Sequence, residues 1–245
     1  MRALLSELVD LVLPVCCARC SGAVRGREAL CGTCWRAFHP IADDTCVRCQ
    51  TVPAAPGARC GSCTNAGDPL DACIAAVWFE GETTPWVHRV KYPRPGIAGL
   101  DPAARAVLAL LALRAAARVA SPAPDRVVPI PLHPRTARRR GFNPAALLAR
   151  QIARRHRIPW DPVGLERLRD TPSQTGLTRK ERFHNVDGAF TAGRALPRRI
   201  WLVDDVVTTG ATLSEAARAA RAAGAREVAA ICVARTPAPG ALRGG

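Results

Sequence analysis

Lysine and aromatic residues are scarce in this sequence, and one long stretch carries no acidic residue. Only two of the 35 basic residues are lysines, aromatic residues make up 4%, and no Asp or Glu occurs between Arg126 and Trp160. The few aromatic side chains leave few platforms on which nucleic-acid bases could stack. The formal net charge of +15 nevertheless favours polyanionic partners or substrates.

The sequence also lacks an uninterrupted apolar segment near its start. Residues 1–13 are rich in Leu and Val, but Glu7 and Asp10 interrupt them and no small-residue cleavage site follows. This pattern predicts a short amphipathic helix packed on the protein rather than a signal peptide. We therefore expect a cytoplasmic protein without a membrane span.

Cysteine, in contrast, is plentiful and regularly spaced. Two Cys-x-x-Cys pairs supply the four thiolates of one tetrahedral zinc site, so four pairs predict two structural zinc ions. Sequential pairing gives tandem zinc ribbons and interleaved pairing gives a cross-brace. A disulfide framework is the further alternative, and a reducing cytosol disfavours it. Cys16, Cys73 and Cys232 lie outside the pattern, the last two in apolar runs typical of buried thiols. The paired residues are Cys17 and Cys20, Cys31 and Cys34, Cys46 and Cys49, and Cys60 and Cys63.

Composition divides the chain into three parts. Few core residues lie between Cys17 and Cys63, so metal binding, worth on the order of 10 kcal/mol per structural site, is expected to fold residues 1–66. Residues 67–237 alternate strand-like and helix-like segments, which predicts an α/β domain with a parallel sheet flanked by helices. Residues 238–245 are rich in Gly and Pro and are expected to form a flexible tail. The expected strands are 72–79, 126–130, 163–168, 188–191, one beginning at 200, and 227–234; the expected helices are 83–91, 101–119, 144–156 and one beginning near 213.

The most informative segment spans residues 200–216. Its apolar start predicts a strand covered on both faces, and ligands of parallel sheets bind beyond the carboxyl ends of the strands. Asp204 and Asp205 come at that end. The turn that follows can direct N–H groups, hydroxyls and a helix amino terminus at a phosphate without a Walker-type lysine. A plain strand-turn-helix with a solvated acidic pair is the alternative. The turn residues are Thr208, Thr209, Gly210, Ala211 and Thr212.

This segment resembles, over its whole length, the phosphoribosyl pyrophosphate (PRPP) signature of type I phosphoribosyltransferases. Both read as a hydrophobic strand, two acids, two hydrophobic residues, Thr-Thr-Gly, a small residue and Thr. The resemblance implies that magnesium-bound PRPP lies with its 5′-phosphate on residues 208–212. It also implies that Asp204 and Asp205 hold the ribose hydroxyls and favour the charge that develops as pyrophosphate leaves.

A second candidate site follows the strand expected at 126–130. Nine arginines lie between Arg126 and Trp160, and four of them occupy the loop expected after that strand. Guanidinium groups there suit a pyrophosphate leaving group, because their donors match phosphate oxygens. Contact with single-stranded DNA is the competing interpretation, and a solvated surface is the third. The four loop arginines are Arg135, Arg138, Arg139 and Arg140.

A third candidate is the polar stretch 171–186, between two expected strands. A loop of this length in a compact domain is typically a functional lid or disordered, although a plain surface loop is an alternative. As a lid it could close over a phosphorylated ligand and exclude water. Its candidate ligand-facing residues are Gln174, Arg179, Arg182 and Asn185.

Taken together, these motifs resemble the ComF family over nearly the full length of the chain. The shared features are the Cys-x-x-Cys pairs, Lys91-Tyr92, the Arg-Arg-Arg-Gly-Phe-Asn run at 138–143, Ser-Gln-Thr-Gly-Leu at 173–177, and the acid pair with Thr-Thr-Gly. The resemblance implies a double zinc ribbon joined to a type I phosphoribosyltransferase-like domain and a role in single-stranded DNA handling during natural transformation. It further implies contact with DNA-uptake machinery proteins. Two departures are Pro-Arg-Pro-Gly at 93–96, where relatives have a small-acidic turn, and Pro144 in place of Gln.

Two classes of function follow. As an enzyme, the protein would be a phosphoribosyltransferase that acts on PRPP or a related phosphorylated ribose, with magnesium at the departing pyrophosphate. As a binding module, it would hold single-stranded DNA or sense PRPP without turnover. No general base is evident; His88, His133 and His184 are candidates by location only, and each also suits an ordinary surface or packed histidine.

Overall fold

The computed structural model describes residues 16–24, 29–52, 54–55, 57–64, 67–92, 101–119, 122–170 and 179–237, with only the backbone described at 179, 180, 182 and 183. The amphipathic helix expected at 1–13 and the tail 238–245 lie outside this part of the chain. The elements are α2 (Gly32–Arg36), α3 (Gly61–Thr64), β1 (Ala72–Trp78), α4 (Thr83–Lys91), α5 (Pro102–Ala117), β2 (Arg126–Pro129), α6 (Pro134–Arg140), α7 (Pro144–His156), β3 (Glu166–Arg167), α8 (Arg179–Val186), β4 (Phe190–Thr191), β5 (Arg199–Val207), α9 (Ala211–Ala222) and β6 (Glu227–Arg235).

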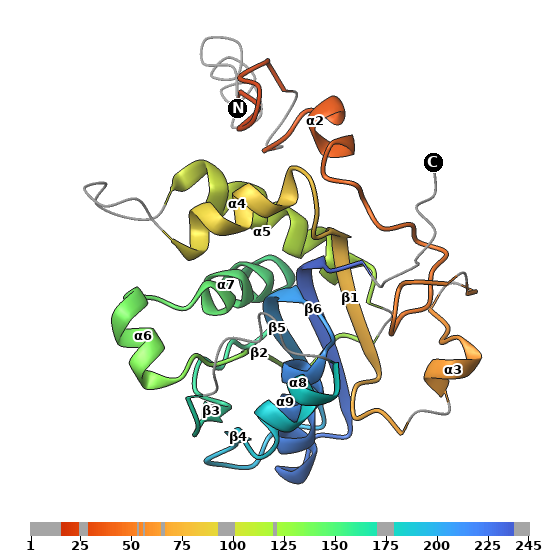
Figure 1. Ribbon diagram of the computed structural model, residues 1–245, viewed down its shortest axis with the longest axis vertical. Coiled ribbons are helices and arrows are strands. Elements are labelled where there is room, and N and C mark those ends of the chain that lie inside the picture. The colour runs from red at the N-terminus through yellow and green to blue at the C-terminus, as the bar shows by residue number, and fades with distance from the viewer. Residues whose placement is uncertain are drawn as a thin grey trace, which may run out of the picture.

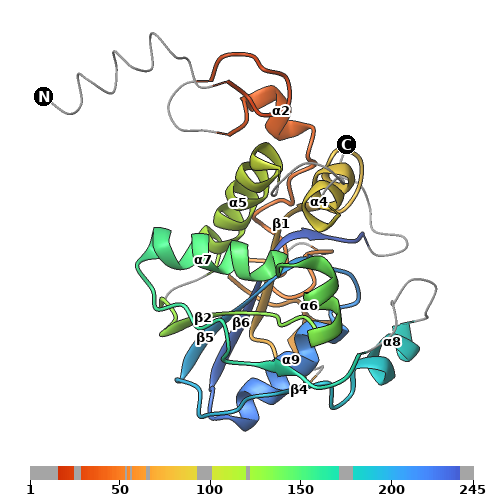
Figure 2. The ribbon, with the colours of Figure 1, turned by 90° about the vertical axis from the view of Figure 1, so that its left-hand side faces the viewer.

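A four-stranded parallel sheet in the order β1-β6-β5-β2 forms the centre of the molecule. Helices α5 and α7 cover one face and α9 covers the other (Figures 1 and 2). The central strands are therefore apolar on both faces, as β5 shows: Trp201 and Val203 join the core under α5 and α7, while Ile200 and Leu202 join the core under α9. This arrangement confirms the predicted fold class.

The local signals read from the sequence located most elements correctly. Helix α4 has the expected bounds, and α7 begins after Asn143, whose side-chain oxygen accepts a hydrogen bond from the Ala145 N–H at 3.0 Å. The strands at the two ends of the sheet order, β1 and β2, also match their predicted segments to within one residue at each end.

Two expectations are wrong. The strand expected at 163–168 is reduced to β3, which pairs antiparallel with β4 in a separate two-stranded sheet. Of its three apolar residues only Leu165 is buried in the core, while Val163 and Leu168 are 62% and 57% exposed. The arginine-rich loop is instead helix α6: Pro134 occupies the first turn, and Gly141, at φ 78°, ends the helix in the left-handed region.

The segment between the two cysteine clusters runs along the free edge of β1. The N–H of Trp78 donates to the His39 carbonyl and the N–H of Ile41 donates to the Ala76 carbonyl, both at 3.0 Å. Further along, the side-chain amide of Gln50 donates to and accepts from the backbone of Ala75, at 2.9 and 2.7 Å. Residues 39–50 thus cover the edge that β1 leaves unpaired. Among the residues that the structure describes, no helix combines the length and hydrophobicity needed to traverse a bilayer.

Candidate functional site

The eight paired cysteines form two four-cysteine clusters. One contains Cys17, Cys20, Cys31 and Cys34, the other Cys46, Cys49, Cys60 and Cys63, and within each cluster all Sγ atoms lie within 4.8 Å of one another. Zn–S bonds of about 2.3 Å give tetrahedral S···S edges of about 3.8 Å. The observed 3.9 Å between Cys20 and Cys31 and between Cys49 and Cys60 fits a zinc ion. Each cluster contains two successive Cys-x-x-Cys pairs, so the tandem pairing is confirmed. All the thiols are free, so the disulfide alternative is wrong.

Backbone N–H groups support the sulfur atoms in both clusters. The Cys17 Sγ accepts from the Cys31 N–H at 3.4 Å, and the Cys46 Sγ accepts from the Cys60 N–H at 3.2 Å. Donors directed at sulfur favour the thiolate that a metal requires. The clusters are therefore structural metal sites whose four ligands leave no open position for chemistry.

The turn predicted to bind phosphate, residues 208–212 and here called the phosphate loop, leads from β5 into α9 at the carboxyl end of the sheet. Thr208 is exposed, Thr209 is half-buried, and Gly210 and Ala211 are buried. Gly210 has φ 81°, a left-handed conformation that glycine adopts at no steric cost, and it turns the chain directly into α9. The first N–H groups of this twelve-residue helix border the loop, which suits an anion.

The acidic pair lies near the carboxyl end of β5, before Val206 and Val207, with its side chains on opposite faces of the sheet. Side chains alternate along a strand, so Asp204 lies on the α9 face and Asp205 on the α7 face. The Asp204 Oδ1 accepts from the Asp205 N–H at 2.9 Å. Burial, followed by the neighbouring charge of Asp205, raises the pKa of Asp204 to about 7. The Asp204 carboxyl group therefore gains or loses a proton near neutral pH.

Lys91, at the end of α4, places a positive charge beside the acidic pair. Its Nζ lies 3.0 Å from the Asp205 Oδ1. Burial alone would lower the pKa of Lys91, but the carboxylates of Asp205 and Asp204 outweigh it and raise that pKa. The sequence offered Lys91 only as part of the family resemblance, without a role, because the contact joins residues far apart in the chain.

Arg167 is a second residue that sequence reasoning missed. It lies in β3, with its guanidinium over the Phe190 ring at 5.5 Å from the centroid. Burial lowers its pKa, and the charges of Asp204 and Asp170 act in the opposite direction. Asp204 therefore has a cation on its side of the sheet, as Asp205 has on the other.

The arginine-rich segment lies beside this site because β2, which precedes it, pairs with β5. Arg140 is half-buried with its guanidinium 5.5 Å from the Tyr92 ring centroid, next to Lys91. Arg135, Arg138 and Arg139 are exposed and form no ion pair with the part of the chain that the structure describes. Only one of the four arginines thus borders the acidic pair, while three face solvent.

The predicted lid is partly described. Gln174 and the side chains of Arg179 and Arg182 lie outside the described residues, while Asn185 is half-buried in α8. The Gly188 N–H after α8 donates to the Glu215 Oε1 on α9 at 2.9 Å, which joins the described end of this segment to the helix that follows the phosphate loop. The lid role itself stays a prediction.

The three candidate histidines make contacts of their own or face solvent. The Nδ1 of His133 accepts from the Arg135 N–H at 3.4 Å and caps α6. His88 packs edge-on against Tyr92, and His184 is exposed. A cavity of about 260 Å³ opens beside Asp205 instead, and its walls are mainly apolar residues of α4, α5 and α7.

Comparison with known proteins places this architecture among described families. The double zinc ribbon domain family matches residues 8–64. DNA utilization protein YhgH of Escherichia coli K12 is 34% identical over 154 residues, or 62% of this chain and 67% of that protein. YhgH of Salmonella typhi is 31% identical over 224 residues, 90% of each chain. Competence protein F of Haemophilus influenzae is 38% identical over 109 residues, 43% of this chain and 48% of that protein.

Among solved structures, an allosteric regulatory enzyme of purine biosynthesis is similar with a TM-score of 0.40 and 22% identity, over 60% of this chain and 30% of that one. Glutamine PRPP amidotransferase from B. subtilis gives a TM-score of 0.38 and 21% identity, over 59% and 30%. The chain thus spans less than a third of these enzymes.

The cysteine clusters, the parallel sheet and the acid-pair motif define a zinc-ribbon protein with a type I phosphoribosyltransferase-like domain. The match to the Salmonella protein extends over nine-tenths of both chains. The chain belongs to the ComF family.

Proposed function

We propose that this protein binds magnesium-PRPP, or a related phosphorylated ribose, at residues 204–212 and acts in the handling of single-stranded DNA. The observation that carries the first part is the meeting of the acidic pair, Lys91 and the phosphate loop at one end of the sheet. The names of the relatives, DNA utilization protein and competence protein F, support the second part.

In this proposal each group has a chemical task. The N–H groups of the phosphate loop and of the first turn of α9 hold the 5′-phosphate. The carboxylates of Asp204 and Asp205 accept hydrogen bonds from the ribose hydroxyls and stabilise positive charge on the ribose ring. Arg140 and the backbone N–H groups near His133 would hold the pyrophosphate group. A bound magnesium ion, which prefers oxygen ligands, would neutralise part of its charge.

A sensor without turnover is the second candidate, and one contact favours it. The Lys91 Nζ lies 3.0 Å from the Asp205 carboxylate and offsets its negative charge, which leaves less charge to stabilise a cationic ribose ring during turnover. A protein that only binds PRPP needs no acceptor and no general base.

Calorimetry with magnesium-PRPP, run beside a pyrophosphate-release assay, tests the proposal. We expect a dissociation constant between about 1 μM and 1 mM, the range typical of enzyme substrates. Binding with release supports the enzyme, and binding without release supports the sensor. Absence of binding by the unaltered protein overturns both.

The exposed arginines of α6 give a separate prediction for DNA. Replacing Arg138 and Arg139 with Ala should reduce the slope of log affinity against log salt for single-stranded DNA by about 1.4, because each phosphate contact contributes about 0.7. Fluorescence anisotropy with a labelled oligonucleotide at several salt concentrations measures the slope. The double variant Arg198→Ala and Arg226→Ala, at the amino ends of β5 and β6, is the matched control because it removes the same charge elsewhere. Equal slopes for the two variants would contradict a DNA role for α6.

A further inference from the structure

The two cysteine clusters begin with the same local sequence, but the arginine within that sequence contacts different parts of the protein in each. Each first pair reads Cys-x-Arg-Cys, with Arg19 in the first cluster and Arg48 in the second. The residue after each pair, Ser21 or Gln50, has a left-handed backbone at φ 59° or 56°, so the two turns have the same form. The different contacts of Arg19 and Arg48 therefore come from the surroundings of each turn and not from its local conformation.

Arg19 remains at the surface. Its Nε and Nη2 donate to the two carboxylate oxygens of Glu82 at 3.0 and 2.7 Å, and both side chains are about one-third exposed. Glu82 precedes the first turn of α4. The first cluster is thus attached to a helix far from the phosphate loop in sequence.

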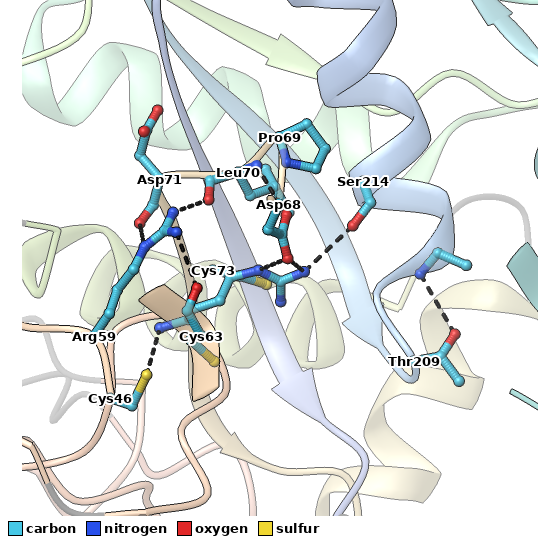
Figure 3. Close-up of polar contacts among 12 residues, drawn as sticks. Cys46, Arg59, Cys63, Asp68, Pro69, Leu70, Asp71, Cys73, Thr209 and Ser214 are labelled. Atoms are coloured by element: carbon cyan, nitrogen blue, oxygen red, sulfur yellow. Dashed lines mark hydrogen bonds and ion pairs between the residues drawn. The ribbon is translucent and has the colours of Figure 1, made fainter. Parts of the chain in front are cut away.

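Arg48 enters the interior and reaches the phosphate loop. It is 8% exposed, its Nε donates to the Asp68 Oδ2 at 2.6 Å, and its Nη2 lies 3.3 Å from the Ser214 Oγ. Figure 3 shows these two partners, Asp68 and Ser214. A Cβ atom placed on Gly210 would lie 3.5 Å from the Arg48 Nη2 and 3.6 Å from its Nη1. The guanidinium therefore packs directly against the turn of the loop and the first turn of α9.

The metal cluster fixes the backbone that carries this guanidinium. The Arg48 N–H donates to the Cys46 Sγ at 3.4 Å, and the Arg48 carbonyl accepts from the Arg235 Nη2 at 3.1 Å at the end of β6. On the opposite side, Asp68 is held because its Oδ1 accepts from the Leu70 N–H at 2.9 Å. The backbone of Arg48 and its partner Asp68 are both fixed by hydrogen bonds, so the buried guanidinium between them has little freedom to move. Its position therefore depends on the cluster.

We propose that Arg48 is a positioning residue for the phosphate loop, through which the second metal cluster sets the conformation of residues 208–214. Arg19 makes no such direct contact with the loop, because its guanidinium ends at Glu82, before the first turn of α4. The inference rests on the proposed function for the identity of the ligand, but the contact between Arg48 and the loop is independent of it.

Hydrogen–deuterium exchange of the unliganded protein is the primary test. In Arg48→Ala, the amides of 208–214 should exchange about tenfold faster, as expected when a buried polar contact that closes a segment is lost. In the matched variant Arg19→Ala they should exchange as in the unaltered protein. Zinc content, measured on the same samples, should stay at two per chain in both. Unchanged exchange at 208–214 in Arg48→Ala would overturn the proposal.

A second variant covers the case in which Arg48→Ala does not fold. Asp68→Asn keeps the Oδ1 acceptor for Leu70 but removes the charge that orients Arg48, and it leaves the cysteine cluster intact. In this variant the amides of 208–214 should exchange faster than in the unaltered protein, but by a smaller factor than in Arg48→Ala. Exchange like that of the unaltered protein in this variant would count against Arg48 as well.

The role of the metal is tested with matched ligand variants. Cys49→Ser and Cys20→Ser each remove the second thiolate of the first pair of a cluster. We expect faster exchange at 208–214 in Cys49→Ser only, with one zinc ion lost from each variant. An equal effect of the two variants on the loop would refute a specific path from the second cluster.

Calorimetry with magnesium-PRPP links the loop to the ligand. The dissociation constant should rise about tenfold in Arg48→Ala and stay unchanged in Arg19→Ala, a coupling of typical size. If the unaltered protein does not bind PRPP, the proposed function fails while the exchange comparison still decides the role of Arg48. If PRPP binds equally to both variants although exchange differs, Arg48 does not position the loop for this ligand.

Discussion

Replacement of Asp204 and Asp205 by Asn is expected to reduce pyrophosphate release at least a hundredfold while PRPP binding weakens only modestly. Asn keeps the size of each side chain but removes the negative charge, and groups that stabilise developing charge contribute roughly 10²–10³ each to turnover. The phosphate loop, which holds the ground state, is unchanged in this variant. Calorimetry and pyrophosphate release, measured on the same preparations, separate the two effects.

Gly210→Ala is the complementary variant. A residue other than glycine is strained at φ 81°, so the loop should distort and PRPP binding should fall together with release. The acid variant thus changes turnover and the loop variant changes affinity. Equal losses of affinity in both variants would contradict the division of labour between carboxylates and loop.

Asp204→Asn alone is expected to stabilise the folded protein at pH 8. The pKa of Asp204 is about 7 in the folded state against an ordinary 3.8, so between these values the folded protein binds more protons than the unfolded chain. Stability therefore falls as pH rises through this window, and the ionised carboxylate costs up to about 4 kcal/mol above pH 7. The amide of Asn retains the oxygen that accepts from the Asp205 N–H. Urea unfolding at pH 5 and pH 8 should show the variant gaining stability only at the higher pH.

Asp125→Asn is the control, because this substitution should lower the free energy of unfolding where Asp204→Asn raises it. The Arg199 backbone N–H and then its guanidinium hold the pKa of Asp125 below its ordinary value, so its carboxylate stabilises the folded state above that value. Its replacement should reduce stability at pH 5 and pH 8 alike. Parallel pH profiles for the unaltered protein and Asp204→Asn would show that Asp204 is not the titrating group.

The elements with strong local signals could be predicted from the sequence. Asn143 and Pro144 mark the start of α7, and the apolar run before Asp204 marks a strand buried on both faces. The cysteine spacing was sufficient to predict two metal clusters, because both ligands of each pair lie within one turn. The position of the acidic pair at the carboxyl end of β5 followed from the same logic.

The cations around the acidic pair and the loop could not be predicted in the same way. Lys91, Arg167 and Arg48 come from α4, β3 and the second cysteine cluster, and only the folded chain brings them to β5 and α9. Helix α6 could have been predicted from the sequence, because a proline in the first turn and a glycine after the last turn are ordinary helix boundaries. The run of arginines between them was interpreted as a loop instead.

The covering of β1 by residues 39–50 has a consequence for handling the protein. An uncovered outer strand presents unsatisfied N–H and C=O groups that can template pairing with a strand of another molecule. Here the Gln50 side chain imitates a peptide group opposite Ala75, and Gln50 directly follows the Cys46–Cys49 pair. Chelation of the second metal ion should therefore release this covering and produce self-association through β1, so that the metal also keeps the protein monodisperse.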